Sequence, residues 1–142
     1  LEHVVESDDA PAIAEGEGVP APAYRHMRRV HSRDGESYCV VSIYIAAAVF
    51  DLAPARFRRE LAIPLLLDLP GVVVGRARQT LDIAAADVDV ARSLGIPVNA
   101  PIAEVRRLFV TPDETVLYVA EASYRGDYIH LEMDLLRGLE PQ

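Results

Sequence analysis

The sequence predicts an α+β domain built on a mostly antiparallel sheet. Along the chain the segments read strand, strand, helix, strand, helix, strand, strand. Asp34-Gly35 stands between the first two strand-like runs, a pair typical of a tight hairpin turn. Hydrophobic residues make up 51% of the chain and charged residues 25%, the composition of a packed globular protein, and 142 residues suit one domain.

Residues 1–23 are predicted to be a linker or N-terminal segment, and residues 24–142 the folded domain. The opening stretch combines acidic residues with several prolines and glycines, which is turn and linker chemistry. The only regular element that we consider in this stretch is a short edge strand.

The first half of the domain is expected to hold two strands and two short helices. The strands fall within 24–46, where the run CVVSIYIA is rich in β-branched and aromatic residues. A helix follows over ARFRREL, with Asp51 as N-cap and Pro54 in its first turn. Pro64 argues against one long helix, so a second short helical segment is expected before residue 70.

The second half is expected to be mainly strands. VVVGRARQTLDI is a strand candidate, and AAADVDVARSLG predicts a short helix that ends at Gly95. A strand over APIAEVRRLFV and a turn at 111–114 follow. The longest strand region is predicted over 115–136.

Charge and cysteine content exclude several classes of partner and site. The net charge of −8, from 22 acidic and 14 basic residues, repels phosphate backbones, so this segment alone is a poor nucleic-acid binder. Cys39 is the single cysteine, which excludes an internal disulfide and a cysteine-cluster metal site and favours a cytoplasmic location. No apolar run approaches the roughly 20 residues of a membrane span, so no membrane partner is expected.

The N-terminus indicates a trimmed chain. The first residues are acidic, unlike a signal peptide, and there is no initiator methionine, so a fragment of a longer protein is expected.

Motifs of catalysis, cofactor binding and metal binding are not found. The sequence has no Gly-rich phosphate loop, no H-E-x-x-H and no G-x-S-x-G. The four histidines, His3, His26, His31 and His130, lack metal-ligand spacing. We therefore expect no catalytic residue, no cofactor and no metal, and a protein that is not an enzyme.

The strand after Ala100 places one arginine among apolar neighbours. Val105, Arg107 and Phe109 share one face because side chains alternate along a strand. A guanidinium among apolar side chains is costly to desolvate unless it is paired, so Arg107 requires a carboxylate, a phosphate or a bound anionic ligand. An internal ion pair or a side chain that reaches solvent is the alternative interpretation.

Two further patterns allow both a functional and a structural interpretation. Small residues between two aromatics predict a hollow in the last strand, where Tyr118, Ala120, Ala122 and Tyr124 share a face. Two phenols there could orient a ligand, although tyrosine pairs are also ordinary core residues. The first strand carries a basic run that predicts either an anion site or a solvated strand face: Arg25, His26, Arg28, Arg29, His31 and Arg33.

From about Tyr24 to Leu136 the chain resembles the UTRA domain, the effector-binding domain of GntR-type bacterial transcription regulators of the HutC subfamily. The resemblance lies in the order and spacing of five phrases. These are RVHSRDGESYCVVSIYIA, GVVVGRARQTLDIAAA, SLGIPVNAPI, EVRRL and the intact Y-R-G-D at 124–127.

This resemblance implies a chorismate-lyase-like fold, a small-molecule effector and a homodimer. It also implies that DNA is contacted only through an N-terminal winged helix that this chain lacks. Transferred position by position, the ligand-binding residues are Arg29, His31, Val41, Arg107, Tyr118 and Tyr124.

The departures from the family pattern narrow the chemical class of the expected effector. Val41 and Tyr118 stand where the family has acidic pocket residues, and the helix start at 61–64 has no Ser or Thr for a phosphate. These changes disfavour a phosphosugar. We expect a small organic acid, with an apolar or aromatic body.

Two other functions compete with an effector sensor. One is a chorismate-lyase-like enzyme acting on a small carboxylic acid, which the loss of a carboxylate at Val41 disfavours. The other is a dimerisation module with a degenerate pocket, which an internal carboxylate partner of Arg107, such as Glu121 or Glu132, would support.

Overall fold

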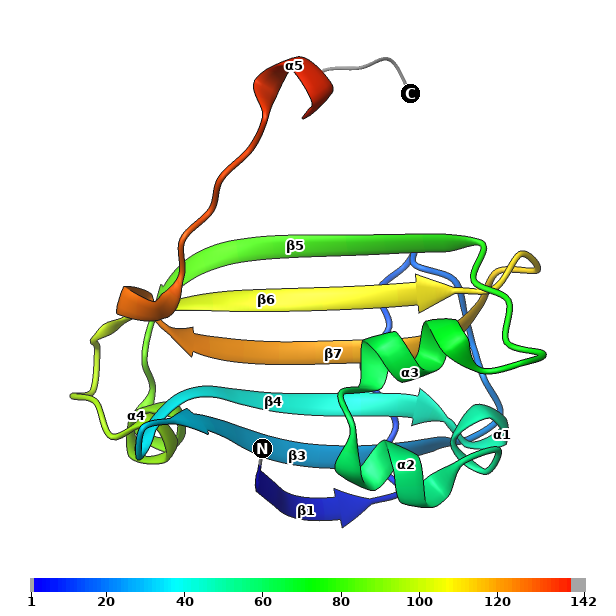
Figure 1. The fold of residues 1–142 in the computed structure, drawn as a ribbon, viewed down its shortest axis with the longest axis horizontal. Coiled ribbons are helices and arrows are strands. Elements are labelled where there is room, and N and C mark those ends of the chain that lie inside the picture. The colour runs from blue at the N-terminus through cyan, green and yellow to red at the C-terminus, as the bar shows by residue number, and fades with distance from the viewer. Residues whose placement is uncertain (1, 139–142) are drawn as a thin grey trace.

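A seven-stranded sheet forms the centre of the structure, a computed structural model that describes residues 2–138 (Figure 1). The strands in chain order are β1 (Glu2–Ser7), β2 (Val19–Pro20), β3 (Tyr24–Arg33), β4 (Glu36–Ala46), β5 (Arg76–Ala85), β6 (Pro101–Val110) and β7 (Thr115–Arg125). Their order across the sheet is β1-β3-β4-β7-β6-β5, with β2 pairing in parallel with the start of β7. The other pairs are antiparallel, which confirms the predicted fold class.

The β3–β4 hairpin turns at the predicted pair. Asp34 and Gly35 have φ of 52° and 80°, positive at both central positions as a type I′ turn requires. Glycine adopts this conformation without strain, and aspartate is one of the few other residues that tolerate it.

Helices cover parts of both faces of the sheet. α1 (Ala47–Phe50), α2 (Pro54–Arg59) and α3 (Ala62–Asp68) lie over one face, and α4 (Val88–Leu94) packs on the other (Figure 1). The chain ends its described part with η1 (Gly126–Tyr128) and α5 (Leu135–Gly138). None of these helices is long and apolar enough to cross a membrane.

Local capping confirms one helix and corrects another. Asp87 accepts a hydrogen bond from the Val90 amide at the start of α4, and Gly95 ends that helix with φ of 65°. Asp51, the predicted N-cap of the helix at Pro54, instead closes α1, because its amide bonds to the Ala47 carbonyl.

Pro54 begins α2 as predicted, whereas Pro64 lies differently from the prediction. Pro64 lies in the first turn of α3, where its missing N–H leaves no helical bond unmade. The break between α2 and α3 is instead at Glu60, whose backbone is extended.

The main core lies between the sheet and α1–α3. Phe50 and Phe57 stack with ring centroids 5.8 Å apart, and both are buried with Leu65 and Leu66 against Ile45 of β4. Burial of these apolar side chains holds the three helices on this face.

A second set of contacts covers the opposite face. Leu94 of α4 packs with Val30, Val40 and Ile102, and Ile13 packs on Leu108 and its buried neighbours. The segment 8–22 therefore closes the end of this face that α4 leaves open.

The segment predicted as a linker also contains the short edge strand that was considered possible from the sequence. β1 pairs antiparallel with β3, and Arg106 Nη2 holds the rest of the segment through the Ala12 carbonyl at 2.7 Å and Glu17 at 2.8 Å. Residues 2–7 are thus part of the sheet. The domain boundary at residues 23 and 24 stays a prediction.

The C-terminal part of the predicted strand region 115–136 does not join the sheet. β7 ends at Arg125, and η1 turns the chain away beside Pro101, where a Cβ at Gly126 would approach the Pro101 carbonyl oxygen to 2.8 Å. Residues 129–134 then run away from the sheet (Figure 1). β5 is likewise shorter than predicted, since it begins at Arg76.

Candidate functional site

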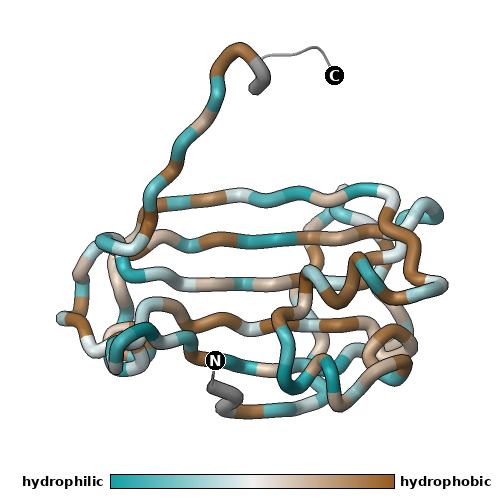
Figure 2. The backbone as a smooth tube through the Cα atoms, in the orientation of Figure 1, coloured by the Kyte–Doolittle hydropathy of each residue, from teal (hydrophilic) through white to brown (hydrophobic). Residues whose placement is uncertain are grey.

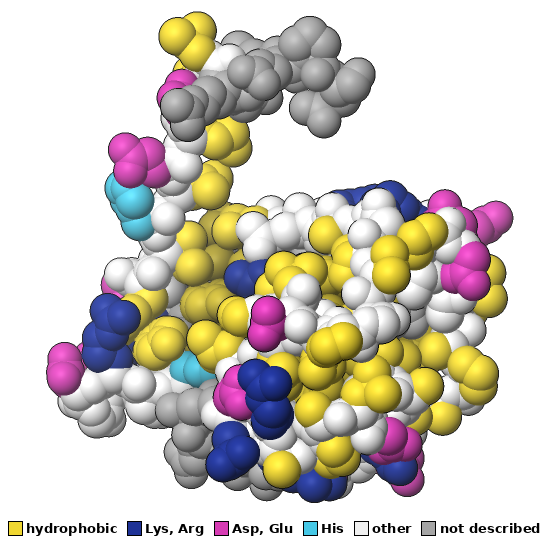
Figure 3. Space-filling model, turned by 45° about the vertical axis from the view of Figure 1, so that its right-hand side comes forward, with side chains coloured by type: hydrophobic (Ala, Val, Ile, Leu, Met, Phe, Trp, Pro, Cys, Tyr) yellow, Lys and Arg dark blue, Asp and Glu magenta, His cyan; other side chains and the backbone are white. Residues whose placement is uncertain are grey.

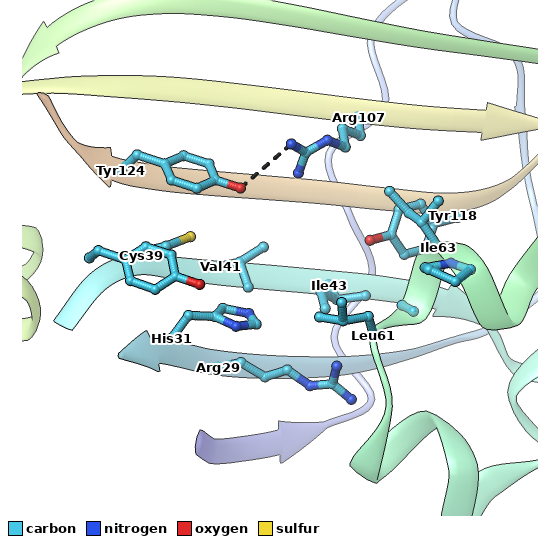
Figure 4. Close-up of a pocket in the computed structure, with 13 residues that line it drawn as sticks. Arg29, His31, Cys39, Val41, Ile43, Leu61, Ile63, Arg107, Tyr118 and Tyr124 are labelled. Atoms are coloured by element: carbon cyan, nitrogen blue, oxygen red, sulfur yellow. Dashed lines mark hydrogen bonds between the residues drawn. The ribbon is translucent and has the colours of Figure 1, made fainter. Parts of the chain in front are cut away.

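A cavity of about 340 Å³ lies between the sheet and the start of α3 (Figure 4). This size is within the range of roughly 300–1,000 Å³ that is usual for small-molecule sites. Its lining comes from β3, β4, β6, β7 and α3: Arg29, His31, Tyr38, Cys39, Val41, Ile43, Leu61, Ala62, Ile63, Pro64, Arg107, Tyr118 and Tyr124.

The cavity brings together every residue that was predicted to bind ligand. The antiparallel register explains this, because directly paired residues point to the same face of the sheet. Arg29 pairs with Val41, and Val41 in turn pairs with Ala122 in β7, next to Tyr124 on that face. The ligand-binding role of the set stays a proposal.

Sequence reasoning missed Tyr38, Cys39 and Ile43. The alternation that places Val41 on this face also places Cys39 and Ile43 there, so that signal was present in the sequence. Tyr38 has the opposite parity. It reaches the cavity beside a β-bulge between His31 and Ser32, a local shift that strand alternation does not reveal.

Arg107 lies in the cavity without a carboxylate partner among residues 2–138. Its Nε donates to Gln79 Oε1 at 2.7 Å, and its Nη2 lies 3.5 Å from the Tyr124 hydroxyl (Figure 4). Glu121, one partner considered from the sequence, instead binds Arg106 at 2.8 Å on the other face. The predicted placement of Arg107 among apolar side chains is confirmed, since Val105 and Phe109 are buried beside it.

Arg29 is fully buried and is largely occupied by backbone. Its Nη1 donates to the Glu60 carbonyl at 3.0 Å, and its Nη2 donates to the carbonyl of Phe57. Its Nε is buried without a hydrogen-bond partner among the described residues. Arg29 is thus held mainly by protein groups, whereas the family resemblance assigned it to the ligand.

Burial favours the neutral forms of four other titratable groups in the cavity. Burial, reinforced by the nearby Arg29 cation, lowers the pKa of His31, and burial raises the pKa of Cys39 to about 11. Burial also raises the pKa values of Tyr118 and Tyr124. With no Asp or Glu in the lining, the two arginines are the charged groups of the cavity at neutral pH.

The basic run of the first strand is divided between two faces. His26 stacks on Tyr44, with ring centroids 4.5 Å apart, and Arg28 Nη2 donates to Ser93 Oγ at 2.7 Å. Arg25 forms an exposed ion pair with Asp8. The run is therefore neither a single anion site nor a solvated face.

A second hollow, of about 430 Å³, lies on the opposite face of the sheet. Its lining mixes acidic side chains with Arg28 and Arg106, and Arg106 is already paired with Glu17 and Glu121. Its arginines are thus occupied by protein groups, which leaves the first cavity as the stronger candidate.

Comparison with known proteins points to one family. The family model described as the UTRA domain matches residues 4–130. No curated protein was found to match the chain.

Several solved structures share the fold. A GntR-family transcriptional regulator from Enterococcus faecalis V583 has a TM-score of 0.73 at 19% identity, covering 94% of this chain and 98% of that one. The effector domain of PhnF from Mycobacterium smegmatis has a TM-score of 0.71 at 19% identity, with 94% and 86% covered. At these identities the likeness is one of fold.

A longer structure is matched over part of its length. The possible transcriptional regulator YydK from Bacillus subtilis has a TM-score of 0.71 at 14% identity, with 94% of this chain covered. The chain spans 61% of that protein's length.

Proposed function

The chain belongs to the UTRA domain family, and on this basis we propose that it is the effector-sensing domain of a GntR-type transcription regulator whose cavity binds a small organic anion. DNA is contacted by a winged-helix domain outside this chain, and the regulator works in the cytoplasm. An effector changes DNA affinity only by as much as it favours one arrangement of the regulator over another.

The position of Arg107 is the observation that carries the proposal. It lines the cavity with no carboxylate partner among the described residues, and its Nη1 donates no hydrogen bond there. A guanidinium binds a carboxylate through charge-assisted, often bidentate bonds, which are strong where water is excluded. Arg29 also lines the cavity, so its positive charge favours an anion there.

The rest of the lining favours an apolar body for the ligand. Val41, Ile43, Leu61 and Ile63 contribute aliphatic surface, and Tyr124 contributes an aromatic ring (Figure 4). Because the start of α3 has neither Ser nor Thr, it offers a phosphate no side-chain hydroxyl. This chemistry supports a small carboxylic acid with an apolar or aromatic body.

Neither competing function gains support. No carboxylate for acid–base catalysis lines the cavity, and burial lowers the pKa of His31, the one histidine in the lining. A dimerisation module with a degenerate pocket would have its inward arginine neutralised internally, whereas Arg107 bonds to an amide and a phenol.

Ligand pairs that differ only in charge test the proposal. We expect benzoate to raise the melting temperature and benzamide to leave it unchanged, with glucose 6-phosphate and free amino acids as further comparisons. A ligand at about 100 times its Kd stabilises by roughly 2.7 kcal/mol. If benzoate does not raise the melting temperature, the screen extends to aliphatic acids and their amides.

Matched variants assign the effect to the cavity. Arg107→Ala should abolish the response to the acid, while Arg92→Ala, on the exposed surface of α4, should preserve it. Equal responses to acids and amides, or an unchanged affinity in Arg107→Ala, would show the proposal to be wrong.

A further inference from the structure

Tyr118 carries a polar group in the ligand cavity that no described protein group satisfies. Its side chain is 3% exposed, and its ring packs edge-on against Phe109 with ring centroids 5.5 Å apart. Its hydroxyl forms no hydrogen bond with residues 2–138, whereas the buried hydroxyl of Tyr24 donates to the Val116 carbonyl at 2.6 Å. A buried tyrosine hydroxyl usually has a partner, so the hydroxyl of Tyr118 is left for a ligand.

The Tyr118 hydroxyl is directed toward the middle of the cavity, near Arg107 (Figure 4). In the β6–β7 register Arg107 lies opposite Ala120, which is two residues from Tyr118 on the same face. Diagonal neighbours of this kind are roughly 7–8 Å apart, within reach of long side chains. Arg107 and Tyr118 are therefore placed to hold the same small molecule.

Tyr118 can only donate its hydrogen to a group outside the two arginines. Burial raises the pKa of its hydroxyl above the usual value of 10, although the Arg107 and Arg29 cations oppose this shift. The phenol is therefore neutral and keeps its hydrogen at physiological pH. Guanidinium groups donate hydrogen bonds and do not accept them. A ligand at this position has to supply the acceptor.

The free end of Arg107 matches a carboxylate by itself. Its Nε is held by Gln79 at 2.7 Å, and its Nη2 makes only a long contact of 3.5 Å with the Tyr124 hydroxyl. Its Nη1 donates no hydrogen bond to the described residues. Nη1 and Nη2 together fit the two oxygens of one carboxylate. An acid bound in this way leaves the Tyr118 hydroxyl for a further oxygen of the ligand.

The apolar surroundings make an unmet hydrogen bond costly at this position. Figure 2 shows a hydrophilic stretch in β6, at Arg106 and Arg107, between hydrophobic stretches. Figure 3 shows hydrophobic side chains gathered around α2 and α3, which cover this face of the sheet. Where water is excluded, a ligand that reaches Tyr118 without an acceptor leaves its hydroxyl unpaired. Such a site discriminates against acids that lack the further oxygen.

We propose that the cavity selects α-keto acids, with the carboxylate on Arg107 and the keto oxygen accepting a hydrogen bond from Tyr118. This inference rests on the proposed function and narrows its ligand class. An α-keto acid carries its second acceptor on the carbon beside the carboxylate, which suits two donors that are neighbours on one face of the sheet. A keto oxygen also has no hydrogen of its own, so it fits between two groups that both donate.

Two pairs of acids test the selection by isothermal titration calorimetry on the full chain. Phenylglyoxylate and phenylacetate have the same charge and differ by a carbonyl in place of a methylene, and α-ketocaproate and caproate form the aliphatic pair. We expect the wild type to bind the keto acid of a pair roughly fivefold or more tightly than its partner, the effect of about one net hydrogen bond.

Tyr118→Phe assigns this preference to the hydroxyl, because it keeps the ring against Phe109. The preference should fall to about twofold or less, while the affinity for the plain acid stays within about twofold of the wild type. Tyr44→Phe, on the opposite face of the sheet, is the matched control and should keep the preference. Without ligand, Tyr118→Phe should melt no lower than the wild type, because no protein hydrogen bond is lost.

The outcomes separate this inference from the proposed function. If the acids bind and Arg107→Ala abolishes binding, an absent keto preference, or one that persists in Tyr118→Phe, overturns the inference and leaves the organic-anion site supported. A lower melting temperature of ligand-free Tyr118→Phe overturns it as well, since the hydroxyl would then have a structural role. Failure of all four acids to bind the wild type would count against the proposed function and would overturn this inference with it.

Discussion

The Arg29 guanidinium of β3 donates a hydrogen bond to the main-chain carbonyl of Glu60, 3.0 Å away, at the end of α2. It also donates to the carbonyl of Phe57 in the last turn. The last carbonyls of a helix have no partner within the helix, and a cation is favourable beside them. Arg29 therefore fixes the α2–α3 turn, from which Leu61 and Ile63 enter the cavity.

Replacing Arg29 should destabilise the fold. Arg29→Met keeps the apolar part of the side chain but leaves one buried and one partly buried carbonyl without this donor, which should cost about 2–4 kcal/mol. Urea denaturation measures the free energy of unfolding. Arg25→Met on the same strand removes only an exposed ion pair and should cost less than about 1 kcal/mol. Equal losses in the two variants would contradict the structural role of Arg29.

Placing an acid at Val41 should abolish binding of organic anions. Val41 is buried in the cavity lining, so Val41→Glu would put a carboxylate beside the arginines and repel the ligand's own. Affinity for an acid that binds the wild type should fall at least tenfold, or about 1.4 kcal/mol, by isothermal titration calorimetry. Val41→Gln has a similar shape without the charge and should lose less. A similar loss in both variants would indicate a steric effect instead.

Breaking the Arg106–Glu17 pair should release the segment 8–22. Arg106 holds Glu17 through two hydrogen bonds, and Glu17 is only 13% exposed. Arg106→Gln should cost roughly 1.5–3 kcal/mol and open the segment to limited proteolysis. Arg56→Gln, which breaks the exposed Arg56–Glu60 helix pair, should leave the free energy of unfolding nearly unchanged. Unaltered proteolysis in Arg106→Gln would count against this anchoring role.

Stability should fall between pH 7.5 and 5.5. Burial lowers the pKa values of His26 and His31 from their usual value of 6.5, so below that pH the unfolded chain binds more protons than the folded one. The stabilising contribution of the two neutral histidines is therefore complete above about pH 6.5, and the free energy of unfolding declines as the pH falls through this value. The pKa of Glu17 is lowered mainly by its hydrogen bond with Arg106. Titration of Glu17 therefore changes the free energy of unfolding only below about its usual pKa of 4.5.

Denaturation at several pH values, with His26→Phe as comparison, checks this dependence. Phe keeps an aromatic ring against Tyr44 but does not titrate, so the variant should show a smaller loss on acidification. Stability that holds or rises on acidification of the wild type would contradict the prediction.

Much of the fold was predictable because its signals are local. Asp34-Gly35 specified its hairpin through two adjacent residues, and Gly95 ended its helix through its own backbone conformation. The face of the sheet on which Arg107, Tyr118 and Tyr124 lie followed from strand alternation, which depends only on whether residue numbers along a strand are odd or even. The prediction that Asp51 caps the start of α2 was wrong, because the residue type alone does not say which of two neighbouring helices it caps.

The sequence by itself determined which residues share a face, the two-residue turn and the strand-like pattern of 129–135. Only the tertiary structure decided that Arg29 is occupied by the carbonyls of α2 while Arg107 faces the cavity, because hydrogen-bond partners come from segments distant in sequence. It also decided that 129–135 lies apart from its own sheet. Alternation specifies which side chains of a strand face the same way, but the partner strand is set by where the chain goes, and here η1 directs it past β5.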